Sequence, residues 1–214
     1  MTERSTAPEM VAVLLAGGLA RRMGGGDKCL RQIAGRSLLS RVIERIGPQV
    51  DRLILNAGGD PERFAAYDLP VVPDVVPGFA GPLAGVLTGL EWVRGHAPRA
   101  GSIVTVPTDT PFLPHDLVER LRRAVSDDEA ELACASTNGR THPVVGLWPV
   151  GVADDLRRAI IDEGVRKIDL WTARYKLAVV EWDADPIDPF FNVNREQDLA
   201  AAWSLMEMVD HNPG

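Results

Sequence analysis

The residues with the clearest potential for chemistry lie in one glycine-rich, basic stretch near the start of the chain. A short apolar run, residues 11–15, leads into two groups of glycines, with Arg22 between them and Lys28 after them. Glycine lets a loop bring its backbone N–H groups close to an anion, and Arg and Lys supply positive charge. The stretch therefore predicts a phosphate-binding loop that follows a buried strand.

This loop departs from the two best-known phosphate-binding signatures. A Walker loop ends in Gly-Lys-Ser or Gly-Lys-Thr, whereas Lys28 stands between Asp27 and Cys29. The dinucleotide-binding pattern GxGxxG is also missing from the stretch, since the double glycine at 17 and 18 does not fit its spacing. We therefore expect a phosphate loop of another kind.

The segments around the loop predict an α/β fold. Expected strands cover residues 11–15, 51–56, 70–74, 102–107, 131–136, 142–148 and 175–182. Expected helices cover residues 38–46, 82–93, 115–125, 152–162 and 195–208, with a short one opening at 164. This alternation predicts a single-domain, three-layer α/β/α architecture with a Rossmann-like, mostly parallel sheet. The Asn138-Gly139 pair is typical of a tight hairpin turn and adds an antiparallel strand.

Polar side chains follow several of the expected strands at the point where each strand ends. Asn56, Asp74 and Asp109 come at or just after the second, third and fourth strands. Because ligands bind at the carboxyl ends of strands in such sheets, these residues and the glycine loop should share one rim. Asp109 suits Mg²⁺, an ion that takes one or two carboxylates and completes its shell with water and phosphate oxygens. Asp109 lies too far upstream of the helix expected from 115 to be a simple N-cap.

Composition limits the kinds of partner. The chain has 23 basic and 30 acidic residues, a net charge of −7, which argues against a general nucleic-acid or anionic-membrane binder. No apolar run approaches a membrane span, and residues 1–9 lack the apolar segment of a signal peptide. We expect a cytoplasmic protein with a flexible N-terminus (1–9), one domain (10–208) and a flexible tail (209–214). The two cysteines match no metal-site spacing.

Three motifs resemble one enzyme family. The order LAGG-x3-RMGG-x-DK at residues 15–28 resembles the opening signature of nucleotidyltransferases, in particular the molybdenum cofactor guanylyltransferases. Residues 106–112, VPTDTPF, are similar to that family's Pro-x-Asp-x-Pro metal motif, with Thr108 where a small residue is usual. Residues 74–85 are similar to its D-x3-G-x2-GPLAG pattern. The resemblance spans about residues 11–199.

The resemblance implies an activity and a set of site residues. It implies transfer of GMP from GTP to the phosphate of molybdenum-loaded molybdopterin, with Mg²⁺ as cofactor and pyrophosphate released. Nucleotide-binding candidates are Leu15, Ala16, Gly17, Gly18, Lys28, Asn56, Asp74 and Asp109. The catalytic candidates are Arg22, Lys28 and Asp109, and Asp109 is the metal ligand. Molybdopterin-side candidates are Gly78, Gly81, Arg166, Lys167, Asn192 and Asn194, with His142 as a weaker one.

Two other functions remain open from the sequence. One is a related nucleotidyltransferase that uses CTP or another phosphorylated acceptor, because the nucleobase is selected by loop geometry and a few hydrogen bonds. The other is a non-catalytic protein that binds nucleotide or cofactor for delivery. The presence of both Lys28 and Asp109 counts against that second possibility. Molybdoenzymes or their chaperones are candidate partners for delivery of the product.

Overall fold

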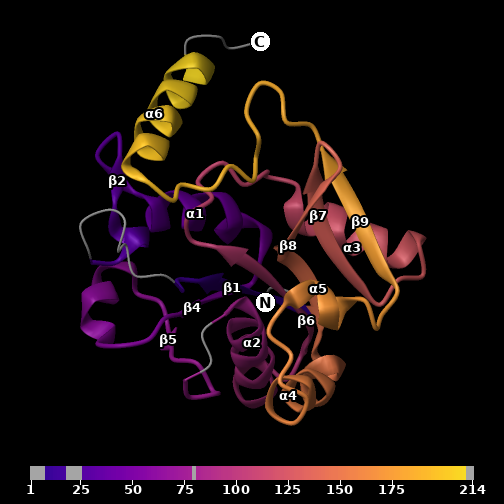
Figure 1. The fold of residues 1–214 in the computed structure, drawn as a ribbon. Coiled ribbons are helices and arrows are strands. Elements are labelled where there is room, and N and C mark those ends of the chain that lie inside the picture. The colour runs from indigo at the N-terminus through magenta and orange to yellow at the C-terminus, as the bar shows by residue number, and fades with distance from the viewer. Residues whose placement is uncertain (1–7, 18–25, 79–80, 211–214) are drawn as a thin grey trace, which may run out of the picture.

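The computed structural model describes residues 8–17, 26–78 and 81–210 (Figure 1). Gly18 and Arg22 of the glycine-rich stretch lie outside the described residues, as do most of the expected flexible termini. No helix in the described ranges has both the length and the apolar character needed to cross a membrane.

A seven-stranded mixed sheet forms the centre of the structure (Figure 1). Its strands, in spatial order, are β5 (Val71–Val72), β4 (Arg52–Asn56), β1 (Glu9–Leu15), β6 (Ala100–Pro107), β8 (Arg140–Pro149), β7 (Leu132–Thr137) and β9 (Leu177–Trp182). All neighbouring pairs are parallel except those of β8, which runs antiparallel to both β6 and β7. The predicted mostly parallel sheet with an antiparallel strand is confirmed.

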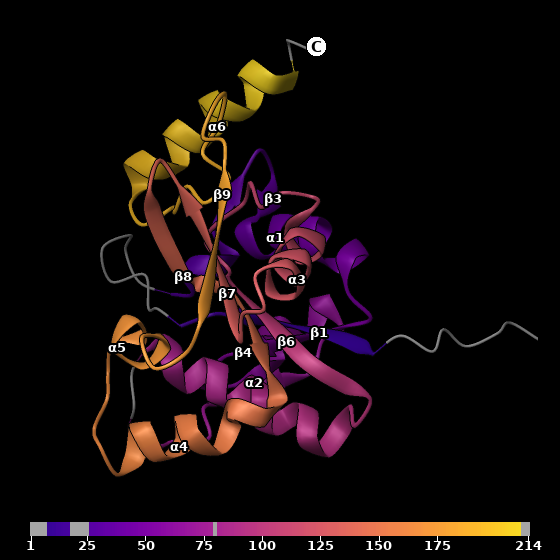
Figure 2. The same cartoon turned by 90° about the vertical axis from the view of Figure 1, so that its right-hand side faces the viewer.

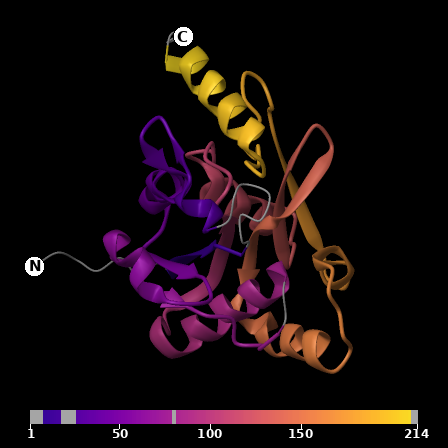
Figure 3. The same ribbon diagram turned by 60° about the vertical axis from the view of Figure 1, so that its left-hand side comes forward.

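Helices cover both faces of this sheet. They are α1 (Leu38–Ile46), α2 (Pro82–His96), α3 (Leu117–Asp127), α4 (Ala153–Ile161), α5 (Ile168–Thr172) and α6 (Glu196–Asp210). Figure 2 shows α1 and α3 together on one side and α2, α4 and α5 on the other. The three-layer α/β/α architecture is therefore as predicted. α6 extends beyond the sheet at the edge of the molecule (Figure 3).

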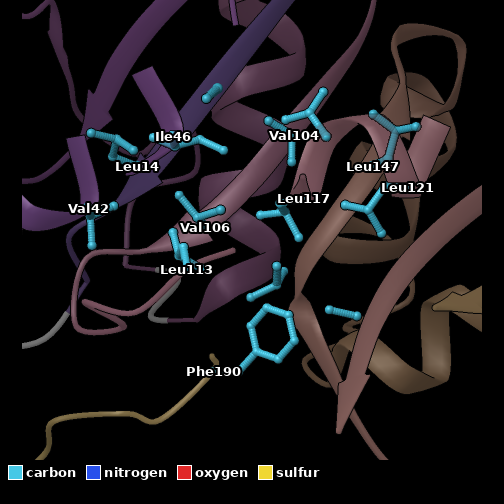
Figure 4. Close-up of a cluster of buried hydrophobic side chains, with 14 of the residues drawn as sticks. Leu14, Val42, Ile46, Val104, Val106, Leu113, Leu117, Leu121, Leu147 and Phe190 are labelled. Atoms are coloured by element: carbon cyan, nitrogen blue, oxygen red, sulfur yellow. The ribbon is translucent and has the colours of Figure 1, made fainter. Parts of the chain in front are cut away.

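The side chains of β1 alternate between two hydrophobic clusters, one on each face of the sheet. Ala12 and Leu14 face the cluster that contains α1 and α3, whereas Val11 and Val13 face the cluster that contains α2 and α4. Successive side chains of a strand point to opposite faces, so a strand covered on both sides reads as a continuous apolar run. Figure 4 shows the first cluster, where Leu14 lies with side chains of both helices and of β6.

Local sequence sets the ends of α1 and α2. Ser37 caps α1, its Oγ accepting a hydrogen bond from the backbone N–H of Ser40 at 2.9 Å. α2 begins at Pro82, where the missing N–H needs no partner. Gly85 in α2 lets the helix lie close to β1 and β4, because a Cβ there would fall 2.5 Å from Leu15 Cδ2. The first turn of α2 therefore lies against the ends of two central strands.

The structure differs from the sequence-based expectation in several places. The strand expected at 70–74 is shorter, as β5, and Glu9, expected in the flexible N-terminus, is a buried residue of β1. A small hairpin, β2 (Gln32–Ile33) and β3 (Arg36–Ser37), precedes α1 and was not expected; its turn places both Ala34 and Gly35 at positive φ. Gly164 does not open a helix. It has φ +69° just after α4, where glycine commonly ends a helix, and α5 begins only at Ile168.

Candidate active site

A cavity of about 480 Å³ opens at the carboxyl ends of β1, β4 and β6. Among the residues that line it are Leu15, Ala16, Gly17, Lys28, Asn56, Asp74, Gly81, Asp109 and Asn192. These residues lie far apart in sequence, and the structure brings them around one space, as the shared rim predicted. Their individual roles in binding stay predictions.

Strand register places the start of the glycine-rich stretch at this rim. Leu15 is paired with Asn56 on β4 and with Pro107 on β6. Beyond the strand, the N–H of Ala16 donates to the Asn56 carbonyl at 2.9 Å, and the N–H of Thr108 donates to the Leu15 carbonyl at 3.2 Å. The start of the glycine-rich stretch, up to Ala16, and the segment that leads into Asp109 are therefore held together by the sheet.

Lys28 and Asp109 form the charged centre of the cavity. Lys28 begins a short 3-10 helix, Lys28–Leu30, and its ammonium group forms an ion pair with Asp109 Oδ2. The same ammonium group donates a hydrogen bond to Asn194 Oδ1 at 2.7 Å. The N–H of Val193 donates to the Asp109 carbonyl at 2.9 Å. A C-terminal segment thus completes a site that begins near the N-terminus.

Asp109 has the features of a ligand for a hard cation. The residue is 8% exposed, and its second carboxylate oxygen, Oδ1, is buried with no hydrogen-bond partner. Leaving a buried acceptor unsatisfied costs about 1–3 kcal/mol, more if it is charged, and a bound cation would remove that cost. Within the described ranges no three His, Cys, Asp or Glu side chains cluster as a metal site. A single carboxylate fits Mg²⁺, which keeps several waters and binds substrate phosphates.

Asn56 is fixed in orientation beside Asp74. Its amide nitrogen donates to the Val72 carbonyl at 3.1 Å and to Asp74 Oδ1 at 2.9 Å. Both amide hydrogens therefore have partners, and the side-chain oxygen keeps acceptor capacity. Asn56 is 7% exposed, whereas Asp74 is exposed at the cavity edge. The pair can accept hydrogen bonds from a nucleobase or a ribose.

Arg63 is a supporting residue that sequence reasoning missed. Its Nε lies 2.7 Å from a carboxylate oxygen of Asp27, the residue before Lys28. The ion pair connects Asp27, which directly precedes the 3-10 helix Lys28–Leu30, to the 3-10 helix Pro61–Tyr67. Asp27 belongs to the recognised motif, but nothing local in the sequence indicates its partner. Cys29, which also lines the cavity, is no candidate nucleophile, because burial raises the pKa of its thiol to about 11.

Only some of the residues predicted on the molybdopterin side lie at the cavity. Gly81 and Asn192 line the cavity, and Asn194 contacts Lys28. Gly78, Arg166 and Lys167 are not among the lining residues. The Arg166 guanidinium donates to the carbonyl of Ile160, near the end of α4, and to that of Val165, beyond it.

His142 also lies outside the cavity lining. Its Nε2 lies 2.7 Å from Thr137 Oγ1, and its ring contacts Phe190 with centroids 4.9 Å apart. Burial lowers the pKa of this imidazole, so it is mostly neutral at physiological pH. His142 therefore contacts Phe190 and Thr137, and its place on the molybdopterin side stays a prediction.

Comparison with known proteins agrees with this geometry. Residues 12–176 match the family model described as a MobA-like NTP transferase domain, and the fold and rim define the chain as a nucleotidyltransferase. A molybdenum cofactor guanylyltransferase of Bradyrhizobium sp. (strain ORS 278) is 57% identical over 208 residues, which cover 97% of this chain and 98% of the relative. The chain belongs to the molybdenum cofactor guanylyltransferase family.

Solved structures share the fold. A molybdopterin-guanine dinucleotide biosynthesis protein A from Archaeoglobus fulgidus has a TM-score of 0.71 and 24% identity, with 93% of this chain and 99% of that chain covered. A Mycobacterium tuberculosis protein, whose structure is described as a complex with manganese, has a TM-score of 0.66 and 22% identity, with 93% and 100% covered. At these identities the likeness concerns the fold.

Proposed function

We propose that this enzyme transfers GMP from GTP to the terminal phosphate of molybdenum-loaded molybdopterin. An oxygen of that phosphate attacks the α-phosphorus of GTP, and the bond from the α-phosphorus to the β-bridging oxygen breaks. The products are molybdopterin guanine dinucleotide and pyrophosphate. Membership of the guanylyltransferase family supports this reaction, and the observation that carries it is the largely buried Lys28–Asp109 ion pair in the cavity at the carboxyl ends of β1, β4 and β6.

The side chains need only position the reactants and neutralise charge. Phosphoryl-type transfer gains most of its rate from alignment and electrostatic stabilisation. Lys28, which lines the cavity, is proposed to neutralise the departing pyrophosphate, together with backbone N–H groups of the loop that follows Gly17. Arg22, outside the described residues, is proposed to add charge there. Asn56 and Asp74 are proposed to accept hydrogen bonds from guanine N–H groups or ribose hydroxyls.

Asp109 is the residue that would hold Mg²⁺. Its unpartnered Oδ1 supplies the donor, and the manganese in the mycobacterial structure supports a divalent ion for this fold. When bound, the ion neutralises phosphate charge and polarises phosphorus–oxygen bonds. The proposed residues on the acceptor side are Gly81 and Asn192, which line the cavity, and Asn194, which contacts Lys28. Weaker candidates, outside the cavity lining, are Gly78, Arg166 and Lys167. We place the reaction in the cytoplasm, with molybdoenzymes or their chaperones as recipients of the product.

A pyrophosphate-release assay tests this function. Purified enzyme is supplied with Mg²⁺ and molybdenum-loaded molybdopterin, and with GTP or CTP in parallel. Release with GTP alone is expected. Release with CTP alone would correct the nucleobase, and release with neither, while GTP still binds, would refute the proposed reaction in favour of another acceptor or a delivery role.

Two variants connect the assay to the site. Asp109→Asn should lower turnover about a thousandfold, because the proposed metal ligand is lost. Asp154→Asn is the matched control, since Asp154 is an exposed carboxylate paired with Arg94 away from the cavity, and its turnover should equal that of the wild type. Near-normal turnover of Asp109→Asn would remove Asp109 from the mechanism.

A further inference from the structure

The ammonium group of Lys28 lies where a cation at Asp109 would lie. It contacts Asp109 Oδ2 directly, while Oδ1 of the same carboxylate is buried and unpartnered. Both side chains are mostly buried, with 16% of the lysine and 12% of the aspartate exposed. One positive charge therefore already neutralises the carboxylate that is proposed to hold the metal.

Asn194 holds the ammonium group in this position. Its Oδ1 accepts a hydrogen bond from Lys28 Nζ at 2.7 Å. Asn194 is itself fixed, because its backbone N–H donates to an oxygen of Asp198 at 2.7 Å at the start of α6. Lys28 thus has two oxygen partners and would lose both if it moved away from Asp109.

We propose that Lys28 excludes free divalent cations from Asp109, so that the metal enters only together with the nucleoside triphosphate. This inference rests on the proposed use of GTP at the same cavity. A divalent ion alone would displace the ammonium group and leave two positive centres beside one carboxylate, which is unfavourable in a partly buried site. A triphosphate brings several negative charges, which neutralise the metal and offer new oxygen partners to Lys28. Metal binding and nucleotide binding are therefore coupled through one side chain.

The coupling is measured by Mn²⁺ binding without turnover. Electron paramagnetic resonance of free Mn²⁺ gives the Kd of the full chain for Mn²⁺ alone. Lys28→Met removes the competing charge, so we expect it to bind Mn²⁺ at least about tenfold more tightly than the wild type. Lys28→Arg keeps a cation and should stay weak. Adding a non-hydrolysable GTP analogue should make the wild type bind Mn²⁺ tightly, measured as Mn²⁺ uptake beyond that of the analogue without protein.

Two controls locate the effect. Lys176→Met causes the same change of net charge at an exposed lysine outside the cavity lining, and its Mn²⁺ affinity should equal that of the wild type. The double variant Lys28→Met with Asp109→Asn should lose the gained binding. Thermal unfolding of each variant establishes that it is folded before titration.

Equal Mn²⁺ affinity of the wild type and folded Lys28→Met, without nucleotide, would overturn the proposal. So would gained binding that persists in the double variant. Pyrophosphate release by the wild type is scored separately. If the wild type releases pyrophosphate but binds Mn²⁺ as tightly as Lys28→Met, only this inference is refuted. If Lys28→Met binds Mn²⁺ more tightly but the wild type releases no pyrophosphate, this inference is supported and the proposed reaction is refuted.

Discussion

The strictest steric constraint near the cavity is at Gly85, and it leads to a quantitative prediction. Gly85 is buried in the first turn of α2, where a Cβ would fall 2.5 Å from Leu15 Cδ2 and 2.6 Å from Asn56 Oδ1. Both separations are far shorter than an ordinary van der Waals contact. Gly85→Ala must therefore move α2 away from the sheet or displace the Asn56 amide, which is held on Asp74.

A second glycine of the same helix provides the matched control. Gly95 is exposed, and a Cβ there would meet nothing within 4 Å. Gly95→Ala should stabilise the protein by about 0.5–1 kcal/mol, the usual helix preference of alanine over glycine. Gly85→Ala gains the same preference but adds an overpacking cost of about 1–3 kcal/mol. We therefore expect Gly85→Ala to be less stable than Gly95→Ala by about 1–3 kcal/mol.

Two measurements separate steric crowding from a loss of function. Urea unfolding of both variants gives the difference in the free energy of unfolding. Titration with a GTP analogue should show weaker binding only for Gly85→Ala, by about tenfold, because the displaced Asn56 loses its acceptor geometry. If Gly85→Ala were as stable as Gly95→Ala and bound the analogue like the wild type, the close packing of α2 on Leu15 and Asn56 would not constrain the site.

Three further predictions concern stability and reactivity. The hydrogen bond from the Tyr175 hydroxyl lowers the pKa of Asp155. The stability that this brings is fully present above the unfolded pKa of 3.8 and is lost as the pH falls through the lower folded pKa. Tyr175→Phe should therefore destabilise the protein at about pH 7, and urea unfolding at successively lower pH should show the difference from the wild type shrinking below 3.8. Burial raises the thiol pKa of both Cys29 and Cys134 to about 11, so neither should react with Ellman's reagent at about pH 8 until urea is added; rapid reaction of the folded protein would contradict their burial. Trp148→Phe removes an indole N–H that donates to the buried Thr105 hydroxyl, and should lower the free energy of unfolding by about 1–3 kcal/mol. An unchanged urea midpoint would show that this hydrogen bond does not stabilise the protein.

Sequence reasoning predicted what depends on local pattern. The helix expected at 38–46 has those bounds as α1, because its apolar spacing, its serine cap and the following Gly-Pro all agree. The positive φ angles of Asn138 and Gly139 fit the predicted hairpin turn. The rim was also predictable, since parallel strands bring their carboxyl ends together whatever lies between them.

Long-range partners could not be predicted in the same way. Lys28 and Asn194 are 166 positions apart, and no periodicity relates them. The hydrogen bonds from the Arg166 guanidinium to the backbone carbonyls of Ile160 and Val165 were not expected either, because the sequence shows only a basic residue that follows a glycine. Basic character in a sequence does not distinguish a ligand contact from a cap on a helix end.

The contact between Lys28 and Asn194 also has a consequence for the order in which the site is made during synthesis. β1, β4 and β6 leave the ribosome early, and the cavity rim can form while the rest of the chain is still being translated. The partners from Val193 and Asn194 emerge only after β9, just before α6. A nascent chain therefore has Lys28 and Asp109 long before it has the residues that contact them, and the ligand-free arrangement of these two side chains arises only after β9 has been made.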